Sequence, residues 1–99
     1  DYYPMTPYSR DRNKWIGWQF NDEDSGEGMI QVFRRDECID DLIEVKPRGL
    51  ETNGEYNIYD INKTWNNRIS GKELIKNGLK IKIETKPGAE TVIYKKISK

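Results

Sequence analysis

The segment spanning residues 14–35 constrains the fold most, because it contains two apolar stretches separated by a short polar one. Residues 14–20 read KWIGWQF and residues 28–34 read GMIQVFR, with an acidic stretch at residues 21–27 between them. Aromatic and β-branched residues on either side of a polar, glycine-containing stretch are typical of a β-hairpin. We therefore predict two antiparallel strands joined by a turn within residues 21–27.

Both faces of this predicted hairpin are apolar. Successive side chains of a strand point to opposite faces, so Trp18 belongs to one face and Trp15 to the other. If Trp18 pairs with Ile30, then Trp15 lies opposite Phe33, with Met29 nearby. One face is sufficient for a core, so we expect the face with Trp15, Met29 and Phe33 to be covered by another body. The sequence does not decide which face points inward.

The rest of the chain consists of short alternating segments separated by turns. Alternation of apolar and polar residues predicts further strands at residues 39–45, 56–61, 79–83 and 91–97. Ser70 followed by Glu73 is a capping box that begins a short helix, and Gly78 ends it. Pro87 and Gly88 turn the chain, which predicts that residues 91–97 pair with residues 79–83. The fold class is therefore all-β: an antiparallel β-sandwich of seven or eight strands with one short helix.

Length and charge limit what the chain can do. Its 99 residues suffice for a single domain, residues 1–99, but not for a catalytic barrel of about 250 residues. The 17 basic and 17 acidic residues cancel, so total charge predicts neither a nucleic-acid nor a membrane partner. Residues 1–62 hold 14 acidic and 7 basic groups, and residues 63–99 hold 3 and 10. We expect these halves to neutralise one another in the fold.

Residue types exclude the common catalytic and metal sites. The chain has no histidine, and Cys38 is its single cysteine, expected to be a small buried side chain. The spacing of the acidic residues 21–27 matches no EF-hand calcium loop, and no pair of carboxylates is singled out for glycoside hydrolysis. We expect no catalytic residue, metal or cofactor. A single cysteine leans to a reducing compartment, so we expect a cytoplasmic protein. No membrane-spanning helix or signal peptide is predicted, and in a fragment the missing signal says nothing about export.

Several short motifs resemble the C-terminal domain of bacterial α-galactosidases of glycoside hydrolase family 36. In chain order they are YYP at residues 2–4, TPYS at 6–9, WQF at 18–20, QVFRR at 31–35, SGKEL at 70–74 and GL at 78–79. The resemblance implies a β-sandwich that follows a (β/α)₈ barrel containing the catalytic aspartates. Lys14-Trp15 is followed by Ile16 rather than by the aspartate of the family's nucleophile motif, so no catalytic role carries over.

The sequence favours one function and leaves two alternatives. We expect an accessory C-terminal domain, a non-catalytic fragment of a larger glycoside hydrolase, that packs against the catalytic barrel of the same polypeptide. An α-galactoside would then be bound only by the intact, retaining enzyme. The first alternative is an autonomous carbohydrate-binding module in which exposed aromatic side chains stack on sugar: Trp15, Trp65, Tyr2 and Tyr3. The second alternative is a plain interaction domain that helps the intact enzyme to form homo-oligomers.

Overall fold

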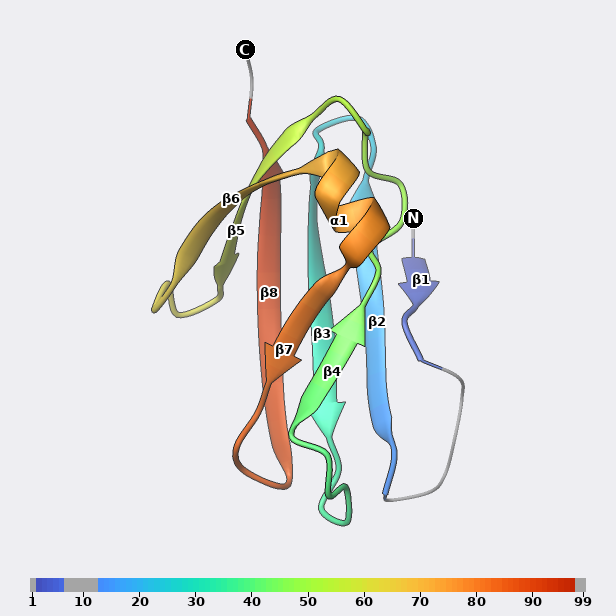
Figure 1. The fold of residues 1–99 in the computed structure, drawn as a ribbon, viewed down its shortest axis with the longest axis vertical. Helices are drawn as coiled ribbons and strands as arrows, with labels where there is room; N and C mark the ends of the chain where they lie inside the picture. The colour runs from blue at the N-terminus through green and yellow to red at the C-terminus, as the bar shows by residue number, and fades with distance from the viewer. Residues whose placement is uncertain (1, 7–12, 98–99) are drawn as a thin grey trace.

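Two layers of antiparallel strands form the fold (Figure 1). The computed structural model describes residues 2–6 and 13–97, and these ranges contain eight strands and one helix. In chain order the elements are β1 (Tyr2–Pro4), β2 (Trp15–Asp22), β3 (Glu27–Arg34), β4 (Leu42–Val45), β5 (Glu55–Asp60), β6 (Asn66–Ser70), α1 (Gly71–Asn77), β7 (Leu79–Lys82) and β8 (Gly88–Lys96). The larger sheet has the order β1-β2-β3-β8-β5-β6, and the smaller pairs β4 with β7. The predicted antiparallel β-sandwich with one short helix is confirmed.

The core lies between the large sheet and a covering layer formed by β4, β7 and α1, which lie in front of the sheet in Figure 1. The strands β3, β5 and β8 supply buried side chains from the large sheet, and the covering layer supplies their partners. The large sheet contributes Ile30, Val32, Tyr56, Ile58, Val92 and Tyr94, and the covering layer contributes Val45, Leu74 and Ile81. We call this side of the large sheet the inner face and the opposite side the outer face.

Helix α1 begins and ends where the sequence predicts. The Ser70 hydroxyl accepts a hydrogen bond from the Glu73 N–H at 3.1 Å, as expected of an N-cap residue. Gly78 has φ of 75° and donates its N–H to the Leu74 carbonyl at 2.9 Å. A side chain at that φ would be strained, so glycine is the favoured residue there. The helix is short and buries Leu74 against the large sheet.

The strand β8 lies in the middle of the large sheet rather than beside β7. The prediction that residues 91–97 pair with residues 79–83 was therefore wrong, because β8 pairs with β3 and β5 while β7 pairs with β4. In β8 both faces carry apolar residues, such as buried Val92 and half-buried Ile93. In β7, Lys80 and Lys82 are exposed on one face. A central strand contacts side chains on both faces, whereas a strand of the covering layer needs only one apolar face.

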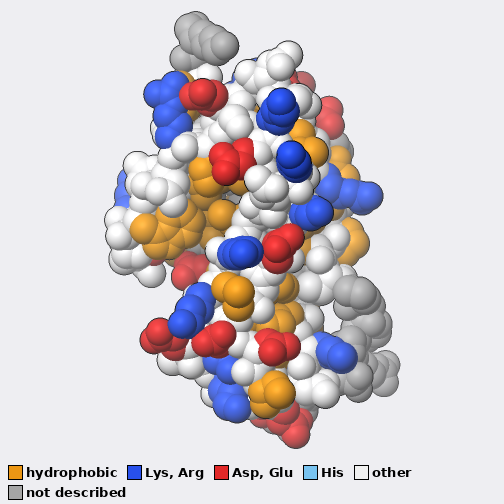
Figure 2. Space-filling model, viewed as in Figure 1, with side chains coloured by type: hydrophobic (Ala, Val, Ile, Leu, Met, Phe, Trp, Pro, Cys, Tyr) orange, Lys and Arg blue, Asp and Glu red, His pale blue; other side chains and the backbone are white. Residues whose placement is uncertain are grey.

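The acidic and basic halves of the sequence meet across neighbouring strands. Four ion pairs within the described ranges join a cation from residues 63–99 to a carboxylate from residues 1–62: Lys82 with Asp41, Lys95 with Glu27, Arg68 with Glu55 and Lys96 with Glu51. Figure 2 shows Lys and Arg side chains interspersed with Asp and Glu side chains over the covering layer. The expected mutual neutralisation is confirmed at these pairs. Within the same ranges, no helix has the length and apolar character needed to cross a bilayer.

Candidate functional site

The register of the β2–β3 hairpin is one residue away from the predicted one. Trp18 lies opposite Gln31, whereas the sequence led us to pair it with Ile30. Gln19 takes the place opposite Ile30 and is fully buried on the inner face. Its Nε2 donates to the Arg48 carbonyl, and its Oε1 accepts from the Arg48 N–H, both at 2.8 Å. Because a buried amide with its hydrogen bonds made costs little, glutamine can occupy the inner face while tryptophan stays outside.

This register separates residues that we expected on one face. A shift of one residue moves every side chain of a strand to the opposite face. Met29 and Phe33 lie on the outer face with exposed fractions of 38% and 37%, whereas Trp15 packs against the core from the inner face. The expectation that Trp15 shares their face was wrong. On the inner face, Gly17 is closely packed, because a Cβ there would lie 3.0 Å from Val32 Cγ1.

The outer face carries three rows of mostly apolar side chains, because antiparallel register aligns residues across neighbouring strands. The first row is Tyr2, Phe20, Met29, Ile93 and Tyr59, the second is Pro4, Trp18, Gln31 and Thr91, and the third is Ile16, Phe33 and Ala89. We call these residues the outer-face band. Between the second and third rows, the rings of Trp18 and Phe33 contact each other, with centroids 5.3 Å apart. The band therefore crosses the sheet from β1 to β5.

The outer-face band is accessible to a partner. Tyr2 is 62% exposed and Phe20 is 48% exposed, and these residues lie opposite each other on β1 and β2. The described elements that pack on the large sheet, β4, β7 and α1, do so through the inner-face core. A contiguous exposed apolar patch on a folded domain commonly marks an interaction site.

A charged row borders the outer-face band at the β2–β3 turn. Asp22, Glu27, Lys95, Asn57 and Arg68 follow one another across β2, β3, β8, β5 and β6, and all of them are exposed. Lys95 Nζ lies 3.9 Å from Glu27 Oε1. Exposed ion pairs of this kind contribute little to stability, but they favour contact with water. The charged row therefore marks an edge of the surface that a partner could cover.

The four aromatic residues predicted as sugar-stacking candidates do not form one platform. Tyr2 belongs to the outer-face band. Tyr3 lies beneath the Arg48 guanidinium, whose carbon is 5.6 Å from the ring centroid. Trp15 and Trp65 are partly buried and pack against the core. Only one of the four, Tyr2, lies on the outer face.

A buried polar network joins β2 to β8 on the inner face. The Tyr94 hydroxyl donates to Asn21 Oδ1 and accepts from Gln19 Nε2 at 2.7 Å. The pKa of Tyr94 is raised to about 12, chiefly by burial, with smaller upward contributions from the nearby Tyr56 and Tyr3 phenols and a downward one from the hydrogen bond with Gln19. A phenol with this pKa stays protonated at neutral pH and serves as a hydrogen-bonding group rather than a base.

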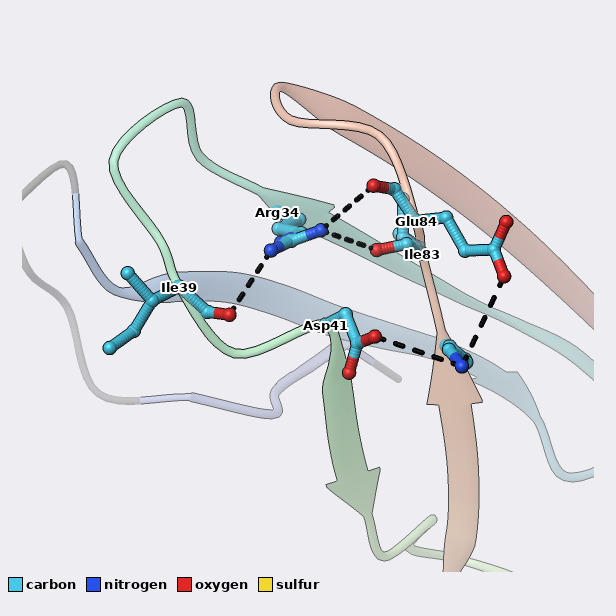
Figure 3. Close-up of polar contacts among 6 residues, drawn as sticks. Arg34, Ile39, Asp41, Ile83 and Glu84 are labelled. Carbon is cyan, nitrogen blue, oxygen red and sulfur yellow. Dashed lines mark hydrogen bonds and ion pairs between the residues drawn. The ribbon is translucent and has the colours of Figure 1, made fainter.

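A second buried polar group, Arg34, holds the other end of the sandwich together (Figure 3). Its Nε donates to the Cys38 carbonyl at 3.0 Å, and its Nη2 donates to the Ile39 carbonyl at 3.2 Å. Its Nη1 donates to the carbonyls of Ile83 at 2.8 Å and Glu84 at 3.1 Å. The guanidinium thereby joins β3, the segment before β4 and the segment after β7. Cys38 itself is buried, as predicted.

Two carboxylates, Asp60 and Glu90, interact electrostatically. Burial raises the pKa of Asp60, but hydrogen bonds from Thr64 and Trp65 outweigh this effect, so the net shift is downward. The Asp60 carboxylate accepts hydrogen bonds from the Thr64 N–H, the Thr64 hydroxyl and the Trp65 N–H. Burial raises the pKa of Glu90, and the charge of Asp60 adds to this effect. Because its oxygens are engaged by the β5–β6 loop, Asp60 fixes that loop instead of facing a substrate.

The acidic turn between β2 and β3 borders an open cavity of about 530 Å³. Glu23, Asp24, Glu51 and Glu55 line it, together with Lys96. Lys96 forms an ion pair with Glu51, and this hydrogen bond raises the pKa of Lys96. Among the described residues, no group of three or more His, Cys, Asp or Glu side chains is arranged to hold a metal ion. The cavity is therefore a solvated, charged depression.

Sequence reasoning missed most of the outer-face band. It named Met29 and Phe33 as interface residues and Tyr2 as a sugar-stacking candidate, but it assigned no such role to Trp18, Phe20 or Ile93. The available signal was the apolar character of both faces of residues 88–96, since strands with two apolar faces are central in a sheet. If residues 88–96 had been predicted as a central strand, the predicted apolar surface would have extended across the sheet.

No protein-family model matches the chain, and no curated protein has a significant sequence match to it. The features of the chain that bear on its function are therefore the outer-face band and the buried polar groups.

Proposed function

We propose that this chain is a non-catalytic C-terminal domain of an α-galactosidase-like glycoside hydrolase, and that its outer-face band packs against the catalytic barrel of the same polypeptide. One observation carries the proposal: a sheet whose inner face already contains the core has an exposed apolar outer face. The resemblance of the sequence motifs to glycoside hydrolase family 36 supports the identity of the neighbour. In this proposal the barrel hydrolyses terminal α-galactosides, and this domain stabilises or positions the barrel.

The size of the exposed patch is sufficient for a tethered neighbour. Tyr2, Phe20, Met29 and Phe33 are 62%, 48%, 38% and 37% exposed. At 150–250 Å² for each large side chain, these four alone expose roughly 300–450 Å² of apolar area, and exposed Pro4 and Ala89 add to it. A stable complex between separate proteins buries about 800 Å² on each partner, whereas contacts between domains of one chain begin near 300 Å² on each side. The patch is therefore large enough for an interface within one polypeptide.

Covalent connection makes such a small interface sufficient. Burial of roughly 300–450 Å² at 25 cal/mol per Å² is worth about 7–11 kcal/mol before the entropy of association is subtracted. A neighbour on the same chain is present at an effective concentration in the millimolar range, so much of that entropic cost does not arise. A second copy of the domain would have to meet the full cost from the same area.

The buried polar chemistry supports an accessory role. The chain has no histidine, the Asp60 carboxylate is engaged by its own loop, and the raised pKa of Tyr94 keeps that phenol protonated. These groups stabilise the fold, and none is free to act as a general base at neutral pH. The isolated chain should therefore give no turnover of an aryl α-galactoside above blank.

Thiol labelling at the outer face tests the proposal directly. We would replace Cys38 by alanine, introduce Phe20→Cys on the outer face, and measure its labelling rate in the 99-residue chain and in the complete polypeptide that includes the barrel. Ile75→Cys is a matched control, because Ile75 is 42% exposed on α1 in the opposite layer. We expect labelling at position 20 to slow at least tenfold in the complete polypeptide and labelling at position 75 to stay the same.

Equal labelling rates at position 20 in the two proteins would refute the proposed docking. If labelling slowed at both position 20 and position 75, the neighbour would also contact the layer formed by β4, β7 and α1. The proposal that it docks on the outer face would then be wrong. Far-ultraviolet circular dichroism checks that the isolated chain with each cysteine substitution is folded.

A carbohydrate-binding module is the second candidate, favoured by the neighbouring exposed rings of Tyr2 and Phe20. Two adjacent aromatic side chains on a sheet can stack on sugar rings. Titration of the isolated chain with galactose, melibiose or raffinose, followed by tryptophan fluorescence, distinguishes the two proposals. We expect no saturation at millimolar sugar. Saturable binding that is lost on Tyr2→Ala would favour the module.

A further inference from the structure

Two polar side chains lie at the centre of the otherwise apolar outer-face band. Gln31 on β3 and Thr91 on β8 are neighbours in its middle row, with Trp18 on the other side of Gln31. Gln31 Nε2 donates to Thr91 Oγ1 at 3.3 Å, and both residues are half-buried. Rows with large apolar side chains lie on either side of this pair. A polar pair in this position differs from the charged row, which lies at the edge of the band.

The pair has hydrogen-bonding capacity that it does not use within the described residues. The Gln31 amide has a carbonyl oxygen that accepts and a second N–H that donates, and the Thr91 hydroxyl has a proton to donate. The only side-chain hydrogen bond that the described residues give either one is the Gln31–Thr91 bond itself. Solvent satisfies the remaining groups while the band is exposed. A partner that covers the band removes that solvent.

We propose that the barrel surface facing the outer-face band presents one hydrogen-bonding group, such as a side-chain amide, opposite Gln31 and Thr91, and that this contact determines the docking register. The inference rests on the proposed function. A buried amide left without a partner costs far more than it contributes when paired. A partner with a purely apolar surface would therefore bind unfavourably over Gln31 and Thr91, although the same surface could cover the rest of the band. The expected complement is an apolar surface with a single polar group that both donates and accepts.

Removing the polar pair separates this arrangement from simple hydrophobic docking. Gln31→Leu and Thr91→Val both make the band more apolar at little change in volume. If docking depended on apolar area alone, each variant would dock as tightly as the parent or more tightly. If the barrel presents a polar group, each variant leaves that group buried without its hydrogen bond, and docking weakens.

The experiment measures labelling of Phe20→Cys in the complete polypeptide, in the Cys38→Ala background, with and without each substitution. We expect Gln31→Leu and Thr91→Val each to reduce the protection of position 20 about tenfold. Thr52→Val, at an exposed threonine between β4 and β5, is the matched control and should leave protection unchanged. Urea unfolding of the isolated chain checks that each variant folds. If Gln31→Leu does not fold, Thr91→Val is the test variant.

The outcomes distinguish the two proposals. Protection that is unchanged or increased in Gln31→Leu and Thr91→Val would overturn the polar contact and leave the docking proposal standing. Absence of any protection at position 20 in the parent polypeptide would instead overturn the docking proposal, and the polar contact with it. Loss of protection in both variants but not in Thr52→Val supports both.

Discussion

Replacing Arg34 by methionine is expected to lower the free energy of unfolding by about 3 kcal/mol, although the change makes the interior more apolar. The reason is that the guanidinium, carried by β3, is the shared hydrogen-bond donor for two other segments, residues 38–39 and residues 83–84. Arg34 donates to the carbonyls of Cys38, Ile39, Ile83 and Glu84. Methionine fills much of the same volume but donates nothing.

The magnitude follows from which carbonyls can find water. Ile39 is 84% exposed and Glu84 is exposed, so their carbonyls can be hydrated in the variant. Cys38 and Ile83 are 1% and 7% exposed, and their hydrogen bonds with Arg34 are buried. Two buried acceptors left unpaired cost about 2–6 kcal/mol. The variant no longer has the desolvation cost of a buried guanidinium, which among the described residues contacts only backbone carbonyls. The absence of that cost offsets part of the loss.

Urea unfolding followed by tryptophan fluorescence and circular dichroism measures the effect. Trp15 lies opposite Arg34 in the β2–β3 register and reports on this end of the sandwich. Arg68→Met is the matched control, since Arg68 is exposed and pairs with exposed Glu55, and it should change stability by about 0.5 kcal/mol or less. Arg34→Lys should lie between the parent and Arg34→Met, because an ammonium cannot span all the carbonyls.

An Arg34→Met variant as stable as the parent, or more stable, would refute this reasoning. Such a result would mean that the cost of burying the guanidinium exceeds the value of its hydrogen bonds, as occurs for some buried ion pairs. A loss equal to that of Arg68→Met would likewise show that the buried carbonyls find other partners.

Two further predictions concern the inner face. The pKa of Tyr94 is raised from 10.0 to about 12, so the stability that its protonated phenol contributes is fully present below pH 10. That contribution should fall by about 1.4 kcal/mol per pH unit as the pH rises from 10 towards 12. Tyr94→Phe should lack this pH dependence. Urea unfolding at pH 8 to 11 measures the free energy of unfolding of the parent and of Tyr94→Phe, and an equal fall with pH in the two proteins would contradict the prediction. Gly28→Ala should lower stability by about 2 kcal/mol or more, because the new Cβ would lie 2.2 Å from the Tyr94 hydroxyl and 2.4 Å from the Phe20 carbonyl oxygen. Gly54→Ala is the control, because the atom nearest to its new Cβ, the Glu51 carbonyl oxygen, is 3.3 Å away. If thermal unfolding showed a comparable loss of stability in Gly54→Ala, this steric explanation would be wrong.

Local signals in the sequence were sufficient for most elements. The capping box at Ser70 and the glycine at position 78 act within one or two turns of helix, so their effect does not depend on the rest of the fold. Aromatic and β-branched residues predicted β2 and β3, and alternation predicted β4, β5, β7 and β8, because side-chain direction in a strand follows from backbone geometry alone. Strand β6 was not predicted, since its Asn66, Asn67 and Arg68 are polar, as suits an exposed edge strand.

The partners and faces of those strands required the tertiary structure. The hairpin register depends on Gln19, whose amide is acceptable inside only because the Arg48 backbone and the Tyr94 hydroxyl meet it there. The position of β8 between β3 and β5 depends on contacts with residues far away in the chain. Neither can be inferred from a local pattern, because each is stabilised by groups brought together only on folding.

The outer-face band combines both kinds of information. The sequence by itself determined that residues 14–35 form a ribbon with apolar residues on both sides, since alternation fixes what each side carries. Only the tertiary structure decided that Trp18, Phe20 and Phe33 remain outside while Gln19 and Arg34 lie inside. The physical reason is that a buried polar side chain is stable where folding supplies its hydrogen-bond partners, and those partners come from distant segments.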